Sequence, residues 1–213
     1  QDKDQAILVG GSGLYIKALC EGLDSFPEIS AETADAVATG EQEGGLPWLQ
    51  KTLEALDPDY FKTVDQQNPA RLRRAIEVCL ETGLPYSSFR KNTRSERPFK
   101  IVYLLLDLPR SILYDRIDKR VDQMIAAGLE AEARSLIAFR DKPALKTVGY
   151  EEFFQYFDGE MDLDETISKI KQHSRNYAKR QATWFRKHGD WTVFHPEDIA
   201  GIMGFLKGVM SDE

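Results

Sequence analysis

The sequence predicts an α/β chain in which helices far outnumber strands. Two continuous apolar runs, Ala6–Val9 and Ile101–Leu106, are typical of parallel strands that are covered on both faces of a sheet. Trp191–Phe194 predicts a third, short strand, while apolar residues spaced three and four apart elsewhere predict long helices. Because so few strands leave unpaired edges, we expect the sheet to be incomplete and the chain to be the C-terminal part of a longer protein.

Composition narrows the class of protein. The 213 residues are 42% hydrophobic and 30% charged, with a net charge of −7, which predicts a soluble globular chain with one or two cores. The longest apolar run is far too short to span a membrane, and no signal peptide is visible. The two cysteines, Cys20 and Cys79, lack the spacing of a metal site, so we expect a reducing, cytoplasmic setting. The three scattered histidines predict no metal site.

A glycine turn follows the first predicted strand. Gly10–Gly13 leads into an expected helix at Leu14–Leu19, and such a turn exposes backbone amides that suit an anion. It is not a Walker A loop, because the required Gly-Lys-Ser/Thr is missing. A tight bend alone would also explain these glycines.

The next region is helical and polar, and we expect it to form an insertion between two strands. Gly44–Gly45 should separate the polar stretch Glu21–Glu43 from a second group of helices. The helices expected after this break are Pro47–Leu56, Pro58–Val64 and Ala70–Glu81. Three arginines in the first turns of the last helix oppose the helix dipole, which hints at an anionic partner, although ordinary surface arginines explain them equally well. They are Arg71, Arg73 and Arg74.

The second half of the chain alternates turns and helices. A basic loop at Ser87–Arg97 precedes the strand Ile101–Leu106, and Pro109 begins a long helix that Gly128 breaks. The segments expected after the break are a continued helix at Glu130–Phe139, a short turn at Lys146–Tyr150 and an amphipathic helix at Glu151–Phe157.

The stretch Lys169–His188 is the strongest functional signal. It contains no Asp or Glu, although the chain as a whole is acidic. Lysine and arginine side chains bind phosphates in nucleic-acid-binding proteins, and aromatic rings placed between them can stack on bases. A solvated basic face is the alternative interpretation. The cations and rings are Lys169, Lys171, Arg175, Lys179, Arg180, Arg186, Lys187, Tyr177, Trp184 and Phe185.

The same helix has a side that should pack against the protein. Asp162 is expected to cap its start and Gly189 to stop it. The amide of Gln181 interrupts this side and needs a partner if it is buried, which favours a functional contact. The predicted packing side comprises Leu163, Ile167, Ile170, Ser174, Tyr177, Gln181 and Trp184.

Several motifs, in order, together resemble one family. They are ILVGGSGLYIKAL, GLDSFPEIS, NPARLRRAIEV, TGLPYSSFRK, RVDQMIAAGLEAE, TVGYEEF and KRQATWFRK. With these motifs the chain resembles the tRNA dimethylallyltransferases, also called tRNA isopentenyltransferases. The resemblance implies a P-loop-kinase-like parallel sheet, from residues 1–20 and 95–213, and a helical insertion domain, residues 21–94, that grips the tRNA anticodon stem-loop.

The resemblance also implies the reaction and its site. The family transfers a dimethylallyl group from dimethylallyl diphosphate to the exocyclic amine of the adenosine 3′ of the anticodon, with Mg²⁺ on the diphosphate and the base drawn out of the stack. By position, Arg120 is the implied catalytic residue at the diphosphate. The implied tRNA contacts are Ser12, Ala70, Arg71, Leu72, Arg73, Arg74, Lys146, Thr147, Val148, Gly149, Tyr150, Glu151, Lys179, Arg180, Gln181, Ala182, Thr183, Trp184, Phe185 and Arg186. We expect no metal ligand in this chain, no membrane contact and a monomer.

The chain departs from the family pattern at several points. The phosphate loop and the general-base aspartate of the family are not found in it, so we expect the chain alone to be inactive. Ala34 and Ala70 stand where the family commonly has Arg and Gln. Three alternatives stay open. An adenylate isopentenyltransferase would not need the basic helix or the insertion, a non-catalytic tRNA-binding module would not need a base, and a small-molecule kinase fragment would not explain KRQATWFRK.

Overall fold

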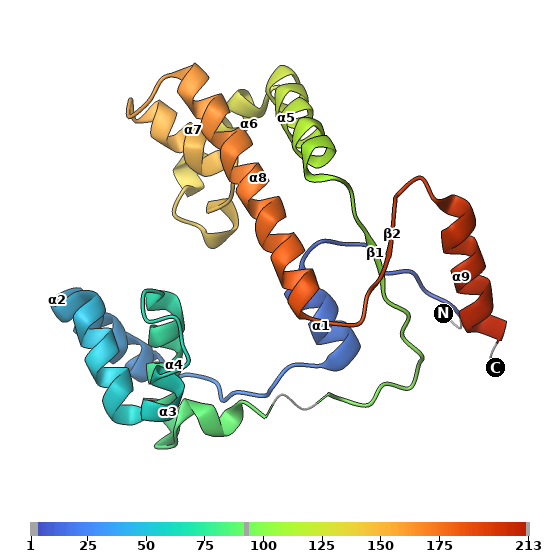
Figure 1. The fold of residues 1–213 in the computed structure, drawn as a ribbon. Helices are drawn as coiled ribbons and strands as arrows, with labels where there is room; N and C mark the ends of the chain where they lie inside the picture. Colours follow the sequence, from blue (N-terminus) through green and yellow to red (C-terminus); the bar gives the residue numbers. More distant parts are fainter. Residues whose placement is uncertain (1–3, 92–93, 212–213) are drawn as a thin grey trace. The chain divides into compact units, whose positions relative to one another are not determined.

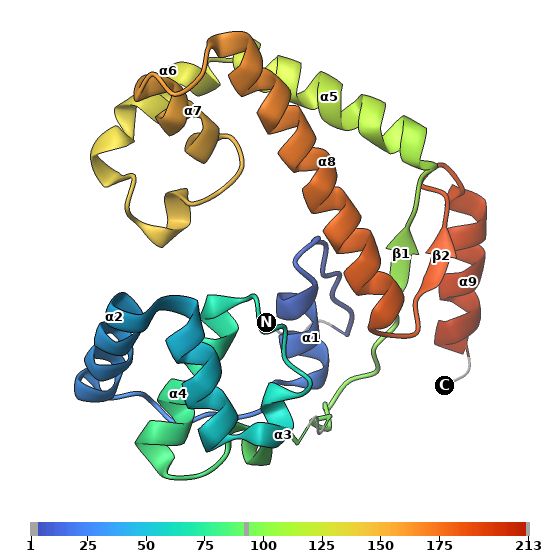
Figure 2. The same ribbon diagram turned by 60° about the vertical axis from the view of Figure 1, so that its left-hand side comes forward.

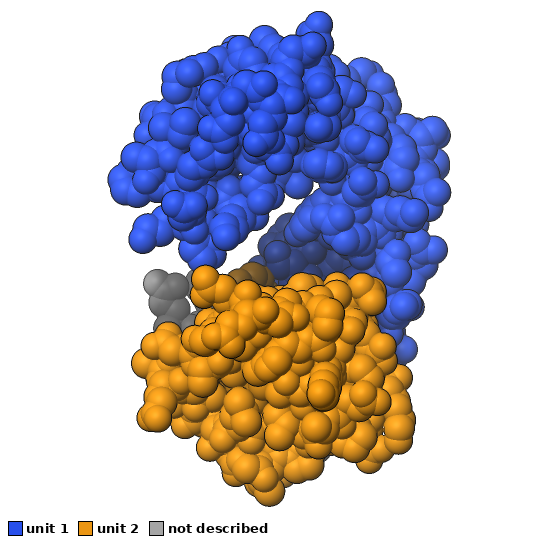
Figure 3. Space-filling model, turned by 90° about the vertical axis from the view of Figure 1, so that its left-hand side faces the viewer, with its two compact units in different colours: residues 1–13, 100–213 blue, residues 14–99 orange. Residues whose placement is uncertain are grey.

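The computed structural model describes residues 4–91 and 94–211. Contacts divide the chain into two compact units, which Figure 3 colours separately. Unit 1 comprises residues 1–13 and 100–213, and unit 2 comprises residues 14–99. The expected insertion, 21–94, lies inside unit 2, and its role in gripping tRNA stays a prediction.

Unit 2 is helical in the part that the structure describes. After α1 (Gly13–Glu21), the elements are α2 (Ala31–Leu56), α3 (Pro58–Phe61), α4 (Pro69–Thr82) and the 3₁₀ turn η1 (Tyr86–Phe89). The expected break at Gly44–Gly45 is a kink inside α2, because Gly45 adopts φ 60° and ψ −155° while the helix continues on both sides. Of the predicted basic loop, residues 92–93 lie outside the described residues.

The core of unit 2 forms where α2 packs against α4. An ion pair joins the same two helices, because Nε and Nη2 of Arg73 donate to the two carboxylate oxygens of Glu41 at 2.5 and 2.7 Å. These hydrogen bonds lower the pKa of Glu41. The buried residues of this core are Val37, Leu49, Leu53, Tyr60, Val64, Leu72, Ala75 and Ile76.

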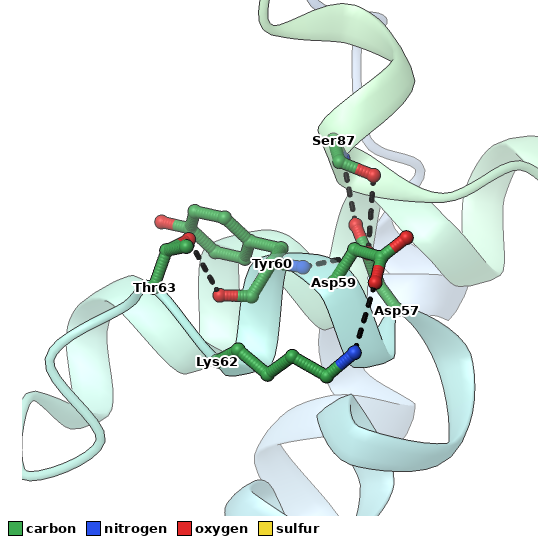
Figure 4. Close-up of polar contacts among 6 residues, drawn as sticks. All are labelled: Asp57, Asp59, Tyr60, Lys62, Thr63 and Ser87. Atoms are coloured by element: carbon green, nitrogen blue, oxygen red, sulfur yellow. Dashed lines mark hydrogen bonds and ion pairs between the residues drawn. The ribbon is translucent and has the colours of Figure 1, made fainter.

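A buried carboxylate, Asp57, joins the short elements of unit 2 (Figure 4). It caps α3 by accepting from the backbone N–H of Tyr60 at 3.0 Å. It also accepts from the N–H of Ser87 at 2.6 Å and from the Ser87 hydroxyl at 3.0 Å. A buried charge is tolerated only when it is hydrogen-bonded, and these three donors satisfy Asp57. Ser87, which belongs to the motif TGLPYSSFRK, therefore links η1 to the start of α3 through Asp57.

Unit 1 contains the sheet. β1 (Leu104–Leu106) pairs in parallel with β2 (Thr192–Phe194), with Leu105 opposite Val193. The predicted α/β class, mostly helical with a small parallel sheet, is confirmed. The helices of this unit are α5 (Arg110–Ala126), α6 (Leu129–Ser135), α7 (Tyr150–Phe157), α8 (Leu163–Lys187) and α9 (Ile199–Ser211), with 3₁₀ turns at Ile137–Phe139 and Pro143–Leu145 (Figures 1 and 2).

One expectation for unit 1 is wrong, and one of its helices was not predicted. Residues 6–9 form no strand, and the side chains of Ile7 and Val9 are 91% and 88% exposed. A strand requires a hydrogen-bonded neighbour, whereas the strands among the described residues pair with each other. Helix α9 was not predicted, because its three glycines lower helix propensity. The start of α9 did carry a signal, since Asp198 accepts a hydrogen bond from the N–H of Gly201 at 2.9 Å.

The helices α5, α6, α7 and α8 enclose the core of unit 1. The buried residues at its centre are Val121, Leu129, Ala133, Phe153 and Ile170. The first half of α8 packs against this core, while its C-terminal half extends beyond it (Figures 1 and 2). None of the helices within 4–91 and 94–211 is both long enough and apolar enough to cross a bilayer.

Candidate nucleic-acid interface

The cations in the first half of α8 are paired with carboxylates. Nζ of Lys169 lies 3.2 Å from Glu165 on the same helix. Lys171 and Arg175 reach across to α5, where they lie 2.6 Å from Asp122 and 2.5 Å from Asp118. These three positive charges are therefore largely cancelled, and this part of α8 offers little net charge to an anion.

The C-terminal half of α8 differs. Among the residues placed by the structure, no carboxylate lies within 4 Å of its four cations. The guanidinium of Arg180 instead lies 5.6 Å from the centre of the Tyr177 ring. The helix dipole also favours cations at this end. The positive potential of α8 is thus concentrated on Lys179, Arg180, Arg186 and Lys187.

An open hollow of about 450 Å³ lies on this half of α8. Its wall includes the ring of Trp184, whose centre is 4.7 Å from that of His188. Cations beside a partly exposed ring suit a nucleotide, because phosphates pair with cations and bases stack on rings. The residues that line the hollow are Asn176, Lys179, Arg180, Thr183, Trp184, Lys187 and His188.

The glycine turn lies against the same half of α8. Nε2 of Gln181 donates to the carbonyl oxygen of Gly11 at 2.9 Å, so the predicted partner of this amide is a backbone group 170 residues away. A Cβ atom on Gly11 would lie 2.3 Å from Gln181 Nε2, and one on Gly13 would lie 2.2 Å from the Trp184 ring. Neither glycine has a positive φ. The turn therefore needs these glycines for close approach to α8, and Ser12, which is exposed, lies between them.

The predicted packing side of α8 is wrong at one position. Tyr177 is 45% exposed, whereas Phe185 is buried. The buried face continues from Ile170 through Ser174, Ala178 and Gln181, which are half-buried, and so leaves Tyr177 on its outer flank. Of the implied contacts on this helix, Phe185 is therefore a packing residue. Ala182 is half-buried, and Thr183 is exposed while its hydroxyl donates to the Lys179 carbonyl.

The turn before α7 presents some of its residues and buries others. Lys146, Thr147 and Glu151 are exposed. Val148 packs against the core, and Gly149 is buried with φ +105°. The Tyr150 hydroxyl donates to Glu132 on α6 at 2.5 Å, and this hydrogen bond raises the pKa of Tyr150.

Sequence reasoning missed a buried carboxylate, Glu152, beside this turn. Its side chain is 4% exposed, and it contacts both Gly149 and His173 of α8. The signal was present in TVGYEEF, because a Glu three residues after the start of a helix matches the capping-box spacing.

The implied tRNA-contacting segment of α4 is described within unit 2 alone. Ala70 and Arg71 are exposed, but Leu72 is fully buried in the core, so its side chain has no surface to offer. Arg73 is held by Glu41, and Arg74 lies 3.6 Å from Glu77. Arg71 is the cation of this segment that lacks a carboxylate partner among the described residues.

Arg120 lies on α5 with an exposed side chain. At about 100° per residue, it falls on the opposite flank of α5 from Asp118 and Asp122, which pair with α8. No ion pair joins it to another residue within the described ranges. A position beside the diphosphate stays a prediction.

The family model that matches this chain describes prenyl transferases, as do the names of two curated relatives. The family model described as IPP transferase matches residues 1–188. A tRNA dimethylallyltransferase of Christiangramia forsetii is 53% identical over 204 residues, which cover 95% of this chain and 67% of that protein. A tRNA dimethylallyltransferase 1 of Bacteroides fragilis is 45% identical over 207 residues, which cover 97% of this chain and 69% of that protein.

Solved structures give a similar fold. The full-length tRNA isopentenylpyrophosphate transferase of Bacillus halodurans matches 94% of this chain with a TM-score of 0.59 and 31% identity. This chain covers 65% of that structure. A eukaryotic dimethylallyltransferase acting on tRNA matches 90% of this chain, with a TM-score of 0.68, and 51% of its own chain is covered. At 22% identity, that second likeness shows the fold alone.

Proposed function

The chain belongs to the IPP transferase family, and we propose that the complete protein transfers a dimethylallyl group to tRNA. The predicted family and the transferase class are confirmed. The chain spans about two thirds of the length of the curated relatives that it matches, and 65% of the Bacillus halodurans structure. The activity, the substrates and the partners of the complete protein are therefore proposals.

The proposed donor is dimethylallyl diphosphate, and the proposed acceptor is the exocyclic amine of the adenosine 3′ of the anticodon. The bond between the allylic carbon and the diphosphate oxygen breaks and releases diphosphate. A bond between that carbon and the amine nitrogen forms, and the amine gives one proton to a general base, which the family resemblance places outside this chain. Such a reaction requires cations near the leaving group and exclusion of water from the carbon that develops positive charge.

One observation carries the tRNA part of this proposal. The C-terminal half of α8 combines four cations that lack carboxylate partners among the described residues with the Trp184 ring and the turn that holds Ser12. The cations would bind phosphates of the anticodon stem-loop, and the ring would stack on a base. Ser12 would place its hydroxyl near the adenosine that accepts the dimethylallyl group. The exposed members of the other implied contacts are Ala70, Arg71, Arg74, Lys146, Thr147 and Glu151.

The proposed role of Arg120 is to bind the diphosphate, where a guanidinium can pair with two oxygens at once. We also propose that Mg²⁺ accompanies the donor. Over the described ranges, no group of three or more His, Cys, Asp or Glu side chains could hold a metal ion. Mg²⁺ would be bound through the oxygens of the diphosphate.

Two further expectations stay predictions. A monomer is expected, which size-exclusion chromatography with light scattering would test. A cytoplasmic location is expected from the scarcity of thiols, and both Cys20 and Cys79 are free.

A transfer assay tests the proposed function. The complete protein is incubated with labelled dimethylallyl diphosphate, Mg²⁺ and either unmodified tRNA or free AMP. We expect label in tRNA, at the adenosine 3′ of the anticodon, and none in AMP, because the cations of α8 bind several phosphates of a folded RNA. Nuclease digestion and mass spectrometry locate the product.

The same assay separates the alternatives. Label in AMP and not in tRNA would identify a nucleotide prenyltransferase. Tight tRNA binding without transfer of label would identify a binding module and would contradict the proposed activity.

A further inference from the structure

The turn Lys146–Glu151 is fastened to the rest of unit 1 at three points. Val148 packs against the core that α5, α6, α7 and α8 enclose. The Tyr150 hydroxyl donates to Glu132 on α6 at 2.5 Å. The third point is Glu152, which reaches back to the turn and forward to α8. The exposed residues Lys146 and Thr147 are thus carried on a well-anchored segment.

Each carboxylate oxygen of Glu152 has a polar partner. Oε2 accepts a hydrogen bond from the N–H of Gly149 at 2.6 Å. Oε1 lies 2.5 Å from Nδ1 of His173. With its side chain 4% exposed, this carboxylate is costly to place unless it is fully hydrogen-bonded. Gly149 needs the cap, since its N–H stands at the start of α7 in a backbone with φ +105°.

His173 contributes little to the apolar packing of α7. Phe153 is fully buried in the core, and the Gly149 cap is complete without a histidine. The side chain of His173 is 46% exposed, so it adds little buried apolar area. Its contribution is a direct link between the turn and α8, two turns before the cations Lys179 and Arg180.

We propose that Glu152 and His173 are positioning residues that hold the turn Lys146–Thr147 at a fixed separation from the cations of α8, so that both meet one tRNA. This inference rests on the proposed function. The two side chains do not touch the tRNA. They act through the turn, because Gly149 is fixed to Glu152 and Glu152 is fixed to α8.

The test is the affinity of the complete protein for unmodified tRNA. His173→Ala keeps the Gly149 cap and removes only the link to α8. We expect Kd and KM for tRNA to rise about three- to tenfold, the effect of one lost hydrogen bond between elements. The KM for dimethylallyl diphosphate and kcat at saturating tRNA should not change, while the Tm should fall slightly, because Oε1 of the buried Glu152 loses its partner. His173→Gln, whose amide can donate to Glu152, should restore the affinity.

Gln172→Ala, at an exposed neighbouring position of α8, is the matched control and should bind tRNA like the wild type. Unchanged tRNA affinity in His173→Ala would overturn the inference. So would a loss of Tm accompanied by equal losses in all kinetic constants, since that pattern describes a structural role.

The inference and the proposed function fail in different ways. If the wild type binds tRNA without transferring the prenyl group, the proposed activity is contradicted. The positioning role is then still decided by the Kd of His173→Ala for tRNA. If the wild type binds no tRNA, the positioning role is overturned as well.

Discussion

Replacing Gly13 with alanine is expected to reduce kcat/KM for prenyl transfer to tRNA by about ten- to a hundredfold, the consequence of an overpacking cost of about 1–3 kcal/mol. The new Cβ would lie 2.2 Å from Cε3 of Trp184, with two more ring atoms at 2.4 and 2.5 Å. An indole ring on a helix cannot yield like a flexible side-chain end. Either the turn or the ring must therefore move, which displaces Ser12 or reshapes the hollow on α8.

The same turn supplies a matched control. A Cβ on Gly10 would meet nothing within 4 Å, so Gly10→Ala should keep wild-type activity. Gly11→Ala should fall between the two, because its Cβ would meet the flexible end of Gln181. Steady-state kinetics at saturating donor measure the effect, and circular dichroism confirms that each variant is folded. Equal activity of Gly13→Ala and Gly10→Ala would show that the packing of the turn on α8 has no part in the reaction.

The second large effect concerns the salt dependence of tRNA binding. Removing Lys179, Arg180 and Lys187 together should reduce the slope of log affinity against log salt by about two to three units, because each cation releases counterions from roughly one phosphate. The variant tested is the triple alanine replacement, and Lys179→Ala alone should lower the slope by about one unit or slightly less. Filter binding over a range of KCl concentrations gives the slopes.

Lys169→Ala is the matched control on the same helix. Lys169 already has a carboxylate partner, Glu165, at 3.2 Å, so its loss should leave the slope unchanged. Gln181→Leu should also keep the slope, because the amide carries no charge and binds the Gly11 carbonyl. Slopes that are the same for Lys169→Ala and Lys179→Ala would contradict the division of α8 into a neutralised half and a cationic half.

Local signals in the sequence located most helices. The start and end of α4 follow from Asn68, whose side chain accepts from the N–H of Arg71, and from Gly83, which adopts φ 69°. Asp162 likewise caps α8 by accepting from the N–H of Glu165 at 2.8 Å. Such signals lie within a few residues of the helix end that they define, so they can be recognised in one sequence.

Long-range pairings could not be predicted in the same way. The partners Asp118 and Asp122 lie on α5, and nothing in the spacing of α8 distinguishes the cations that they neutralise from those that they leave free. Gln181 was correctly expected to need a partner, but its partner depends on which backbone comes near. For Leu72, the family motif implied a tRNA contact, whereas the buried face of α4 assigns its side chain to the core.

The central claim is that the glycine turn and the C-terminal half of α8 receive the anticodon stem-loop. Photo-cross-linking tests it most directly. An anticodon stem-loop RNA with 4-thiouridine beside the acceptor adenosine is irradiated with the complete protein, and the linked peptides are identified by mass spectrometry. We expect links to residues 10–13 and 176–188. Links confined to the neutralised half of α8, residues 163–175, or found only outside both segments, would contradict the claim.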